Sequence, residues 1–286
     1  MVQREATEWP YAGYFGGVIT FGGQVFINSF FKFITMAKLK GIIKIEGTLQ
    51  DMTFYKTQDG HLVKTKSGVS GNRIANDAAF ARTRENGAEF GSAAKAGKIL
   101  RDCVRVLMQS ASDNRITSRV TQLMYRIQLQ DTTSARGQRN VSLGIATTEG
   151  QNLVKSFNFN DKSVLGSILH KPYSVDTATG VITIADFTPS LDIKAVPGAT
   201  HVTLSGAFAA VNFETGESEI KYTNSENLAI DDTVTQITLT PTAVPTVTGT
   251  HFFLLEVVYF QEVNGTQYSL NNGLFNALSI IDLDTP

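Results

Sequence analysis

The spacing of apolar residues changes once along this chain, and that change limits the folds that the sequence can adopt. Between residues 95 and 130, apolar side chains recur every three or four positions, as on one face of a helix. Beyond Val141, short apolar runs of strand length alternate with turn sequences. The sequence therefore predicts an α+β protein, in which a β-hairpin and helices are followed by an antiparallel, immunoglobulin-like β-sandwich.

Hairpins are predicted in both halves of the chain. Asp59-Gly60 and Asn264-Gly265 each separate two β-prone runs, and such dipeptides favour the positive φ angles of a tight hairpin turn. The predicted strands of the second half share an enrichment in β-branched and aromatic residues. They cover residues 174–184 (with a turn at 177–180), 202–213, 218–223, 235–240, 252–263, 266–270 and 278–283.

Two amphipathic helices are predicted between the first hairpin and the strands. Their apolar faces contain, in the first helix, Leu100, Cys103, Val104 and Leu107 and, in the second, Ile116, Val120, Leu123 and Ile127. Asp77 and Asp113 stand at positions where an N-cap side chain accepts hydrogen bonds from free amides. Gly87 and Gly91 lie in an Ala-rich stretch before the first apolar face, and we consider either close backbone packing or a break between two shorter helices there, with the break favoured.

Charge is distributed unevenly along the sequence. Residues 36–140 carry 18 Lys and Arg against 9 Asp and Glu, whereas residues 141–286 carry 5 Lys, no Arg and 15 Asp and Glu. Residues 1–35 carry two charges of each sign. We therefore expect three segments: a poorly defined leader (1–35), a basic hairpin and helical module (36–140) and an acidic β-sandwich module (141–286).

The leader contains an uncharged stretch at residues 11–31 that glycine, glutamine and asparagine interrupt. It is a poor match both to a transmembrane helix, which needs about 20 predominantly apolar residues, and to a signal peptide, which needs a basic start. Translation from Met36, a loose hairpin or interfacial segment, and a targeting or anchoring segment are the three interpretations, and the first is favoured. We expect a cytoplasmic protein, with a membrane partner only if residues 11–31 form a real anchor.

No motif for catalysis, metal binding or cofactor binding is present in the sequence. Cys103 is the only cysteine, and its apolar neighbours predict a position in the core. The four histidines lack the spacing of metal ligands (His61, His170, His201 and His251). We therefore expect a protein that is not an enzyme and that needs no cofactor.

Basic side chains on the predicted helices form the one pattern with chemical content. At about 100° per residue, Arg115, Arg119 and Arg126 fall in a narrow stripe beside the apolar face of their helix. Lys98, Arg101 and Arg105 form a second stripe on the preceding helix. Such stripes would present guanidinium groups to phosphates or to an acidic partner, although any amphipathic helix needs a polar outer face. The candidate anion-binding or partner-binding residues are Lys98, Arg101, Arg105, Arg115, Arg119, Arg126, Arg136 and Arg139.

Self-association would use both signs of charge. The basic segment of one molecule would attract the acidic segment of another, head to tail and in a salt-sensitive manner. We therefore expect a non-enzymatic interaction or assembly protein whose partner is itself or another protein. The alternatives are a nucleic-acid-associated protein that uses the arginine stripes and a β module that binds a saccharide.

Three stretches of the sequence resemble an uncharacterised bacterial protein family. They are Met36-Ala37-Lys38 through Phe54-Tyr55-Lys56, Asn86-Gly87-Ala88-Glu89-Phe90, and Phe260-Gln261-Glu262-Val263-Asn264-Gly265. The resemblance extends from about residue 36 to the end and supports a start at Met36. It implies no activity, no cofactor and no functional residue.

Overall fold

The computed structural model describes residues 20–21, 24–25, 37–38, 45–58, 60–65, 68–111 and 113–285. Its contacts divide the chain into two units, Met1–Ser70 and Gly71–Pro286. The predictions about residues 11–31 and about a start at Met36 lie outside the described residues, apart from two short strands. These strands, β1 (Thr20–Phe21) and β2 (Gln24–Val25), pair antiparallel.

The first unit contains an antiparallel sheet in the order β3-β6-β5-β4. The strands are β3 (Ala37–Lys38), β4 (Gly47–Leu49), β5 (Met52–Thr57) and β6 (Gly60–Thr65). The predicted hairpin at Asp59-Gly60 is confirmed, because Thr57 is paired with Gly60 at the end of β5 and β6. The described side chains of residues 45–65 are all exposed or half-buried.

The second unit begins with helices. They are α1 (Gly71–Asn76), the 3-10 turn η1 (Ala78–Phe80), α2 (Ala81–Cys103), α3 (Arg105–Ser110), α4 (Ile116–Gln128), α5 (Val141–Ile145), α6 (Thr148–Val154) and α7 (Leu165–Ile168). Both predicted apolar faces are confirmed, since all eight side chains are buried, but the first face is divided between α2 and α3, which meet at Val104. The predicted change to strands after Val141 is wrong, because α5, α6 and α7 come first.

Helix α2 continues through both glycines, so the favoured break near Gly87 and Gly91 is wrong. Close packing at these glycines is also absent, since a Cβ atom at either position would have no described neighbour within 4 Å. The close approach lies one turn and a half further on. A Cβ atom at Gly97 would lie 3.3 Å from the side chain of Val120 and 3.5 Å from the Cα atom of Thr121 on α4.

Two antiparallel sheets follow the helices. The six-stranded sheet is made of β9 (His201–Val211), β10 (Ser218–Tyr222), β11 (Glu226–Ala229), β13 (Thr250–Val263), β14 (Thr266–Ser269) and β15 (Ala277–Asp284). The three-stranded sheet has the order β12-β8-β7, from β7 (Ser174–Val175), β8 (Ile182–Phe187) and β12 (Thr235–Leu239). Two short helices, α8 (Pro189–Asp192) and η2 (Leu270–Gly273), lie between strands. The predicted strands 202–213 and 218–223 pair as a hairpin in β9 and β10, and the predicted hairpin at Asn264-Gly265 is confirmed.

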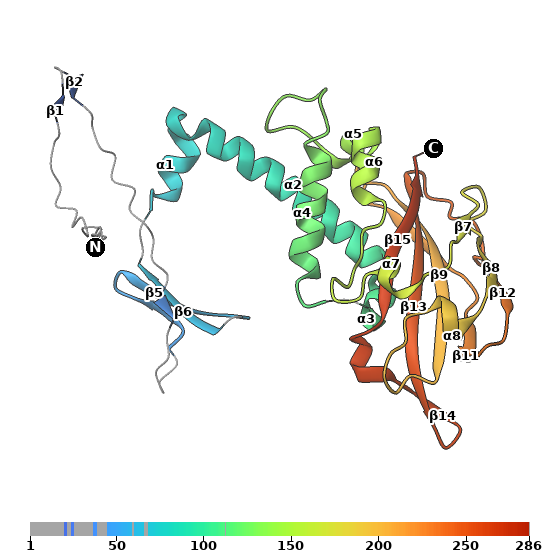
Figure 1. Ribbon diagram of the computed structural model, residues 1–286. Coiled ribbons are helices and arrows are strands. Elements are labelled where there is room, and N and C mark those ends of the chain that lie inside the picture. Colours follow the sequence, from blue (N-terminus) through green and yellow to red (C-terminus); the bar gives the residue numbers. More distant parts are fainter. Residues whose placement is uncertain are drawn as a thin grey trace, which may run out of the picture. The chain divides into compact units, whose positions relative to one another are not determined.

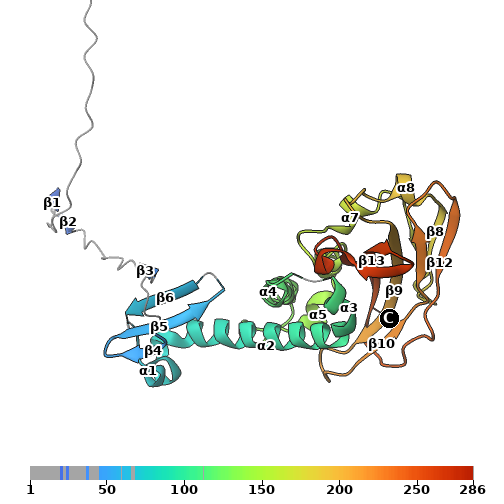
Figure 2. The ribbon, with the colours of Figure 1, turned by 90° about the horizontal axis from the view of Figure 1, so that it is seen from below.

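The second unit has three layers, with the helices on one face of the six-stranded sheet and the three-stranded sheet on the other (Figure 1, Figure 2). The long strand β13 is buried on both faces: Phe252 and Leu254 pack against the helices, and Val257 and Tyr259 pack against the three-stranded sheet. The alternation follows from the period of two in a strand. An α+β fold with antiparallel sheets is thus present.

The expected module boundary near residue 140 does not separate two cores. One hydrophobic cluster contains residues of α2 and α4 together with residues of β9, β13 and β15. The contacts divide the chain between Ser70 and Gly71 instead. The physical reason is that the apolar faces of the helices need a partner surface, and the six-stranded sheet supplies it.

Candidate functional site

Several of the predicted basic residues are held by carboxylates of the second unit. Arg119 is paired with Asp113, Arg139 with Glu89, and Arg136 with Glu85. The predicted stripe of Arg115, Arg119 and Arg126 is therefore interrupted at Arg119, and the guanidinium groups of Arg136 and Arg139 also have partners within the unit.

Arg119 joins α4 to the loop that precedes α7. Its guanidinium pairs with Asp113, whose side chain is only 2% exposed, and donates a hydrogen bond to the carbonyl oxygen of Asn158 at 2.6 Å. The ring centroid of Phe157 lies 5.3 Å from the guanidinium carbon. Burial would raise the pKa of Asp113, but hydrogen bonds from backbone amides and the charge of Arg119 outweigh it and lower that pKa.

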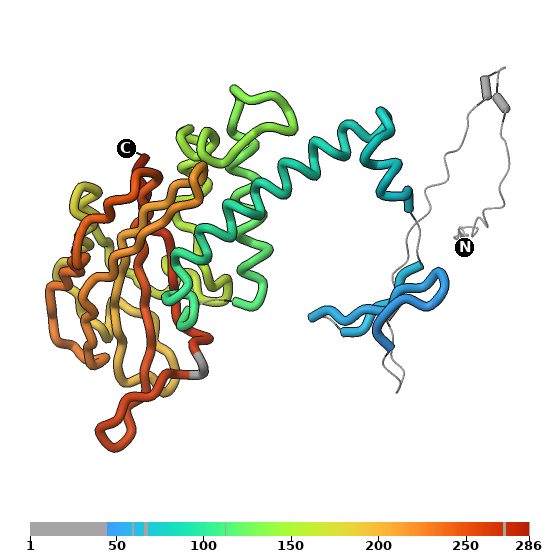
Figure 3. Tube along the Cα trace, turned by 180° about the vertical axis from the view of Figure 1, so that it is seen from behind, coloured from blue at the N-terminus to red at the C-terminus, as the bar shows by residue number. Residues whose placement is uncertain are grey.

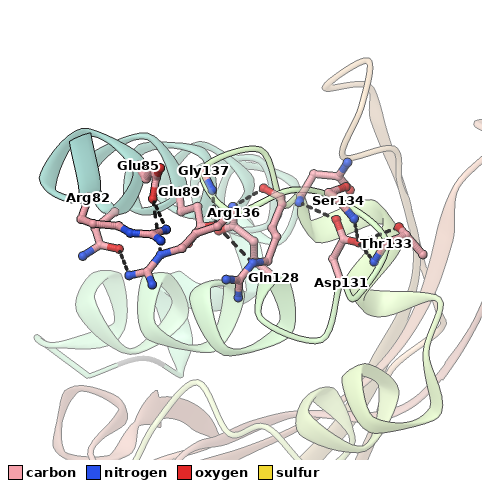
Figure 4. Close-up of polar contacts among 12 residues, drawn as sticks. Arg82, Glu85, Glu89, Gln128, Asp131, Thr133, Ser134, Arg136 and Gly137 are labelled. Carbon is pink, nitrogen blue, oxygen red and sulfur yellow. Dashed lines mark hydrogen bonds and ion pairs between the residues drawn. The ribbon is translucent and has the colours of Figure 1, made fainter. Parts of the chain in front are cut away.

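A second cluster attaches the loop after α4 to helix α2 (Figure 4). Glu89 of α2 is buried, accepts a hydrogen bond from the amide of Gly137 at 2.7 Å, and lies 3.3 Å from Nε of Arg139. Arg136 donates to the amide oxygen of Asn86 at 2.9 Å. Both arginines of this loop therefore have structural contacts.

Asp131 holds the same loop from within. Its carboxylate accepts hydrogen bonds from the amides of Thr133 and Ser134, each at 3.0 Å, and from the amide of Asn140 at 3.2 Å (Figure 4). Burial would raise the pKa of Asp131, but these hydrogen bonds outweigh it and hold the pKa well below its usual range.

The remaining candidates differ in their surroundings. Arg105 and Arg126 are exposed and form no ion pair with a described residue. Lys98 pairs at 3.6 Å with an exposed carboxylate one turn later, and such a pair contributes little. Arg101 has a buried Nη1 atom without a hydrogen-bond partner among the described residues. The amide of Arg115 donates to the Asp113 carboxylate just before α4.

A groove between α2 and α4 was not predicted. It has a volume of about 580 Å³ and carries two aromatic residues, Phe90 from α2 and Tyr125 from α4. Phe90 is 58% exposed. The other lining residues are polar and uncharged: Asn86, Thr117, Ser118, Thr121 and Gln122. The signal in the sequence was the absence of charge at four polar positions of α4, where a solvated helix face usually carries Lys or Glu.

The helical layer and the two sheets of the second unit differ in net charge. Residues 71–170, which contain α1 to α7, carry 14 Lys and Arg against 8 Asp and Glu. Residues 171–286, which contain the sheets, carry 3 Lys against 13 Asp and Glu. Counted by unit, Met1–Ser70 has a net charge of +3 and Gly71–Pro286 a net charge of −4. The charge difference between the layers of the second unit, +6 against −10, is therefore larger than that between the two units.

Glu256 is a buried acid between the helices and the six-stranded sheet. Its carboxylate accepts hydrogen bonds from the hydroxyl groups of Ser110 on α3 and Ser205 on β9. Burial raises the pKa of Glu256, and the two hydroxyl groups offset this only in part. Neither partner carries a positive charge, so the ionised carboxylate is stabilised by neutral donors alone.

Replacement of Glu256 by glutamine is expected to stabilise the protein at pH 7–8 by on the order of 1 kcal/mol. A raised pKa in the folded state means that the acid favours folding while it is protonated, and that this contribution is lost as the pH rises through the raised pKa. The gain should therefore shrink toward pH 4. Thermal unfolding of both proteins at several pH values measures it, and an equal loss of stability at every pH would contradict it.

Other titratable groups do not gather into a reactive cluster. Burial raises the pKa of Cys103 to about 11, so the thiol is protonated at neutral pH, and the predicted core position is confirmed. Within the part of the chain that the structure describes, no three side chains of His, Cys, Asp or Glu are placed to hold a metal ion. No described helix has the length and hydropathy that a membrane span requires.

Comparison of the chain with protein-family models, with curated proteins and with solved structures gives no match. The resemblance to a bacterial family stays a prediction, and the site is judged on its own geometry.

Proposed function

We propose that this chain is a non-enzymatic assembly protein that associates head to tail with copies of itself through oppositely charged surfaces. The observation that carries the proposal is the separation of charge between the helical layer and the sheets of one unit, +6 against −10. Because both layers share a core, they are held in a fixed arrangement. A basic face of one copy then attracts an acidic face of the next, which is a heterologous contact.

Exposed side chains of both signs support this role. On the helices, Arg105 and Arg126 are exposed without a described ion partner. Among the sheets, Asp186, Asp231 and Asp232 are exposed. Ions in solution screen such contacts, with a Debye length of about 10 Å at 0.1 M salt. The association should therefore weaken as the ionic strength rises.

The first unit supports a contact role through its apolar side chains. Strand pairing places Leu49, Met52, Phe54 and Val63 on one face of its sheet. Leu49 is 59% exposed, and Met52 is also exposed. A small sheet gains stability when its apolar face is covered, and a partner surface would supply that cover.

Static light scattering of the full chain across a salt series tests the proposal. We expect an average mass above that of the 31.1 kDa monomer at low ionic strength and a fall toward it at high ionic strength. A monomer at every salt concentration and protein concentration would reject head-to-tail association.

Charge reversal of Arg105 and Arg126 together is expected to weaken self-association at low salt by about tenfold or more, because two cations of the attracting face become anions. The matched control is Lys194→Glu, a reversal at an exposed lysine of the acidic segment, which should leave association as strong as before or strengthen it. Sedimentation velocity measures both. Equal weakening by the control would show that net charge alone, and not its placement, governs association.

The finer fold class and the alternative partners belong to this proposal. The packing of two antiparallel sheets supports a sandwich of the immunoglobulin-like kind, as extracellular and assembly modules often use. A nucleic-acid partner is the alternative. It would be favoured if charge reversal of Arg105 and Arg126 abolished retention on heparin without changing the oligomeric state. A saccharide partner would require exposed aromatic platforms.

A further inference from the structure

A buried carboxyl group joins the helical layer of the second unit to its six-stranded sheet. Glu256 lies in the middle of β13, opposite Ser205 of β9 on one side and Leu278 of β15 on the other. These three strands run side by side, and the helical layer lies next to them (Figure 3). Only 6% of Glu256 is exposed, and its side chain contacts Ser110, the last residue of α3. The carboxyl group is therefore enclosed by both layers.

Three oxygen atoms form a row at this contact. The hydroxyl oxygen of Ser110 lies 2.8 Å from the carbonyl oxygen of Leu107, about one turn earlier in α3. The same hydroxyl oxygen is within hydrogen-bond distance of Oε1 of Glu256. A serine near a helix end commonly donates to a carbonyl oxygen three or four residues earlier. Each of the two contacts needs a proton, because a hydrogen bond requires a donor between its two oxygen atoms.

The row contains one hydroxyl proton, since a serine side chain has a single O–H donor. If Ser110 donates that proton to Glu256, its hydroxyl oxygen and the carbonyl oxygen of Leu107 are left 2.8 Å apart without a hydrogen bond. If Ser110 donates to Leu107 instead, the proton of the other contact must come from Glu256. A protonated carboxyl group has one O–H donor, whereas an ionised one only accepts. Both contacts are therefore satisfied only by a neutral Glu256.

The second carboxyl oxygen also fits the neutral form. Oε2 of Glu256 accepts the hydroxyl proton of Ser205 at 3.0 Å. A neutral carboxyl group can donate from one oxygen and accept at the other, which matches the two serine contacts. Within the part of the chain that the structure describes, no Lys, Arg or His lies within ion-pair distance of Glu256. An ionised carboxylate would thus be buried without a counter-charge, which is costly.

The groups around Glu256 supply no positive charge. Two titratable side chains share this side of the sheet with it, Tyr222 of β10 and Cys103 at the end of α2. Burial raises the pKa of both, that of Cys103 to about 11, so both are uncharged near neutral pH. Arg105, the one charged residue of α3, is exposed. The other charged or titratable residues of β9, β13 and β15 lie at least three positions along their strands from Glu256 or from the residue opposite it.

We propose that Glu256 stays a neutral carboxylic acid near neutral pH in the folded chain and forms a pH-sensitive contact between the helical layer and the six-stranded sheet. The neutral acid donates to Ser110 and accepts from Ser205, so it connects α3 to β9 and β13. Ionisation removes the donated proton and leaves a buried charge, which favours a state in which water reaches Glu256 and α3 separates from the sheet. This contact acts within one copy and does not require self-association.

The direction of the pH effect follows from the environment of the acid. Burial raises the pKa of Glu256. The stabilisation that the neutral acid gives is therefore complete below the ordinary carboxyl pKa and is lost as the pH rises through the raised value. The contact between α3 and the sheet should be tightest in acid and should loosen as the pH rises.

Infrared spectroscopy of the full chain tests the proton directly, because a protonated carboxyl group has a C=O stretching band that a carboxylate lacks. At pH 6, where an ordinary glutamate is ionised, we expect this band in the unmodified chain and its complete loss in Glu256→Gln. Glu89→Gln is the matched control. Glu89 is also buried, but its contacts with the amide of Gly137 and the guanidinium of Arg139 both come from donors, so the band should persist. A missing band, or one that Glu256→Gln retains, would overturn the neutral acid.

The single cysteine reports on the separation of α3 from the sheet. Cys103 is buried where α2 ends, just before α3, so reagents reach it when this region opens. Its reaction rate with a pyridyl disulfide is compared between the unmodified chain and Glu256→Gln at each pH, which cancels the ionisation of the thiol. Glutamine can donate to Ser110 and accept from Ser205 but does not ionise.

We expect the ratio of the two rates, unmodified chain over Glu256→Gln, to rise by about tenfold or more between pH 5 and pH 8, as a pKa difference of one unit or more between the closed and open forms requires. A ratio that stays constant over this range would overturn the pH-sensitive contact. Circular dichroism at both pH values checks that each protein remains folded.

Discussion

Replacement of Gly144 by alanine is expected to lower the free energy of unfolding by about 3 kcal/mol. Gly144 lies in α5, where a Cβ atom would be placed directly against the carbonyl oxygen of Ile127 and 3.3 Å from the Cα atom of Gln128. Both neighbours are backbone atoms of α4, so the contact is relieved only if one helix moves. Urea denaturation monitored by circular dichroism measures the loss.

The matched control for this substitution is Gly91→Ala. Gly91 lies in α2, where an added Cβ atom would have no described atom within 4 Å, and alanine there should stabilise the protein by about 1 kcal/mol through helix propensity. The two substitutions add the same methyl group and are expected to have opposite signs. Equal stability of Gly144→Ala and the unmodified chain would contradict the close contact between α4 and α5.

Removal of the Arg119 side chain is expected to cost about 3 kcal/mol, because the buried carboxylate of Asp113 loses its counter-charge. The lowered pKa of Asp113 means that its contribution to stability is present above the ordinary carboxyl pKa and is lost as the pH falls through the lowered value. The difference between Arg119→Ala and the unmodified chain should therefore shrink in acid. Thermal unfolding from pH 7 down to pH 3 follows it.

Arg126→Ala is the control on the same helix. Its guanidinium is exposed and has no described ion partner, so its removal should change stability by less than about 0.5 kcal/mol. A loss as large as that of Arg119→Ala would show that the two arginines do not differ as the structure indicates. Comparison of the two variants also distinguishes an arginine that stabilises the fold from one that is exposed and can contact a partner.

Local signals made much of the fold predictable from the sequence. The hairpin at Asn264-Gly265 follows from φ angles that this dipeptide adopts at low cost. Helix α4 follows from apolar residues at helical spacing, all of them buried as predicted. Turn chemistry and short-range periodicity depend only on neighbouring residues, so both can be recognised in a single sequence.

Features that depend on length or on distant contacts were not predictable. Helices α5 to α7 contain four to seven residues each, which is too short for a helical period to emerge. Helix α2 runs through Gly87 and Gly91 because its second half is anchored by the core and the intervening residues favour helix. The apolar faces of α2 and α4 indicated burial but not the surface that buries them.

The candidate site shows the same limit. The contact between Glu89 and Arg139 joins residues 50 positions apart, and that between Arg119 and Asn158 joins residues 39 positions apart. Helical spacing placed Arg119 on the outer face of its helix, and no local pattern indicated a carboxylate partner for Arg139. The groove at Phe90 depends on the crossing of two helices, which no local pattern specifies.

The shared core also restricts how this chain can be rearranged during evolution. A recombination event that exchanged the residues before position 140 for those of another gene would leave one face of the six-stranded sheet without its partner. An exchange between Ser70 and Gly71 would leave that core whole. Natural shuffling and engineered fusions should therefore tolerate a junction at the latter point and reject one at the former.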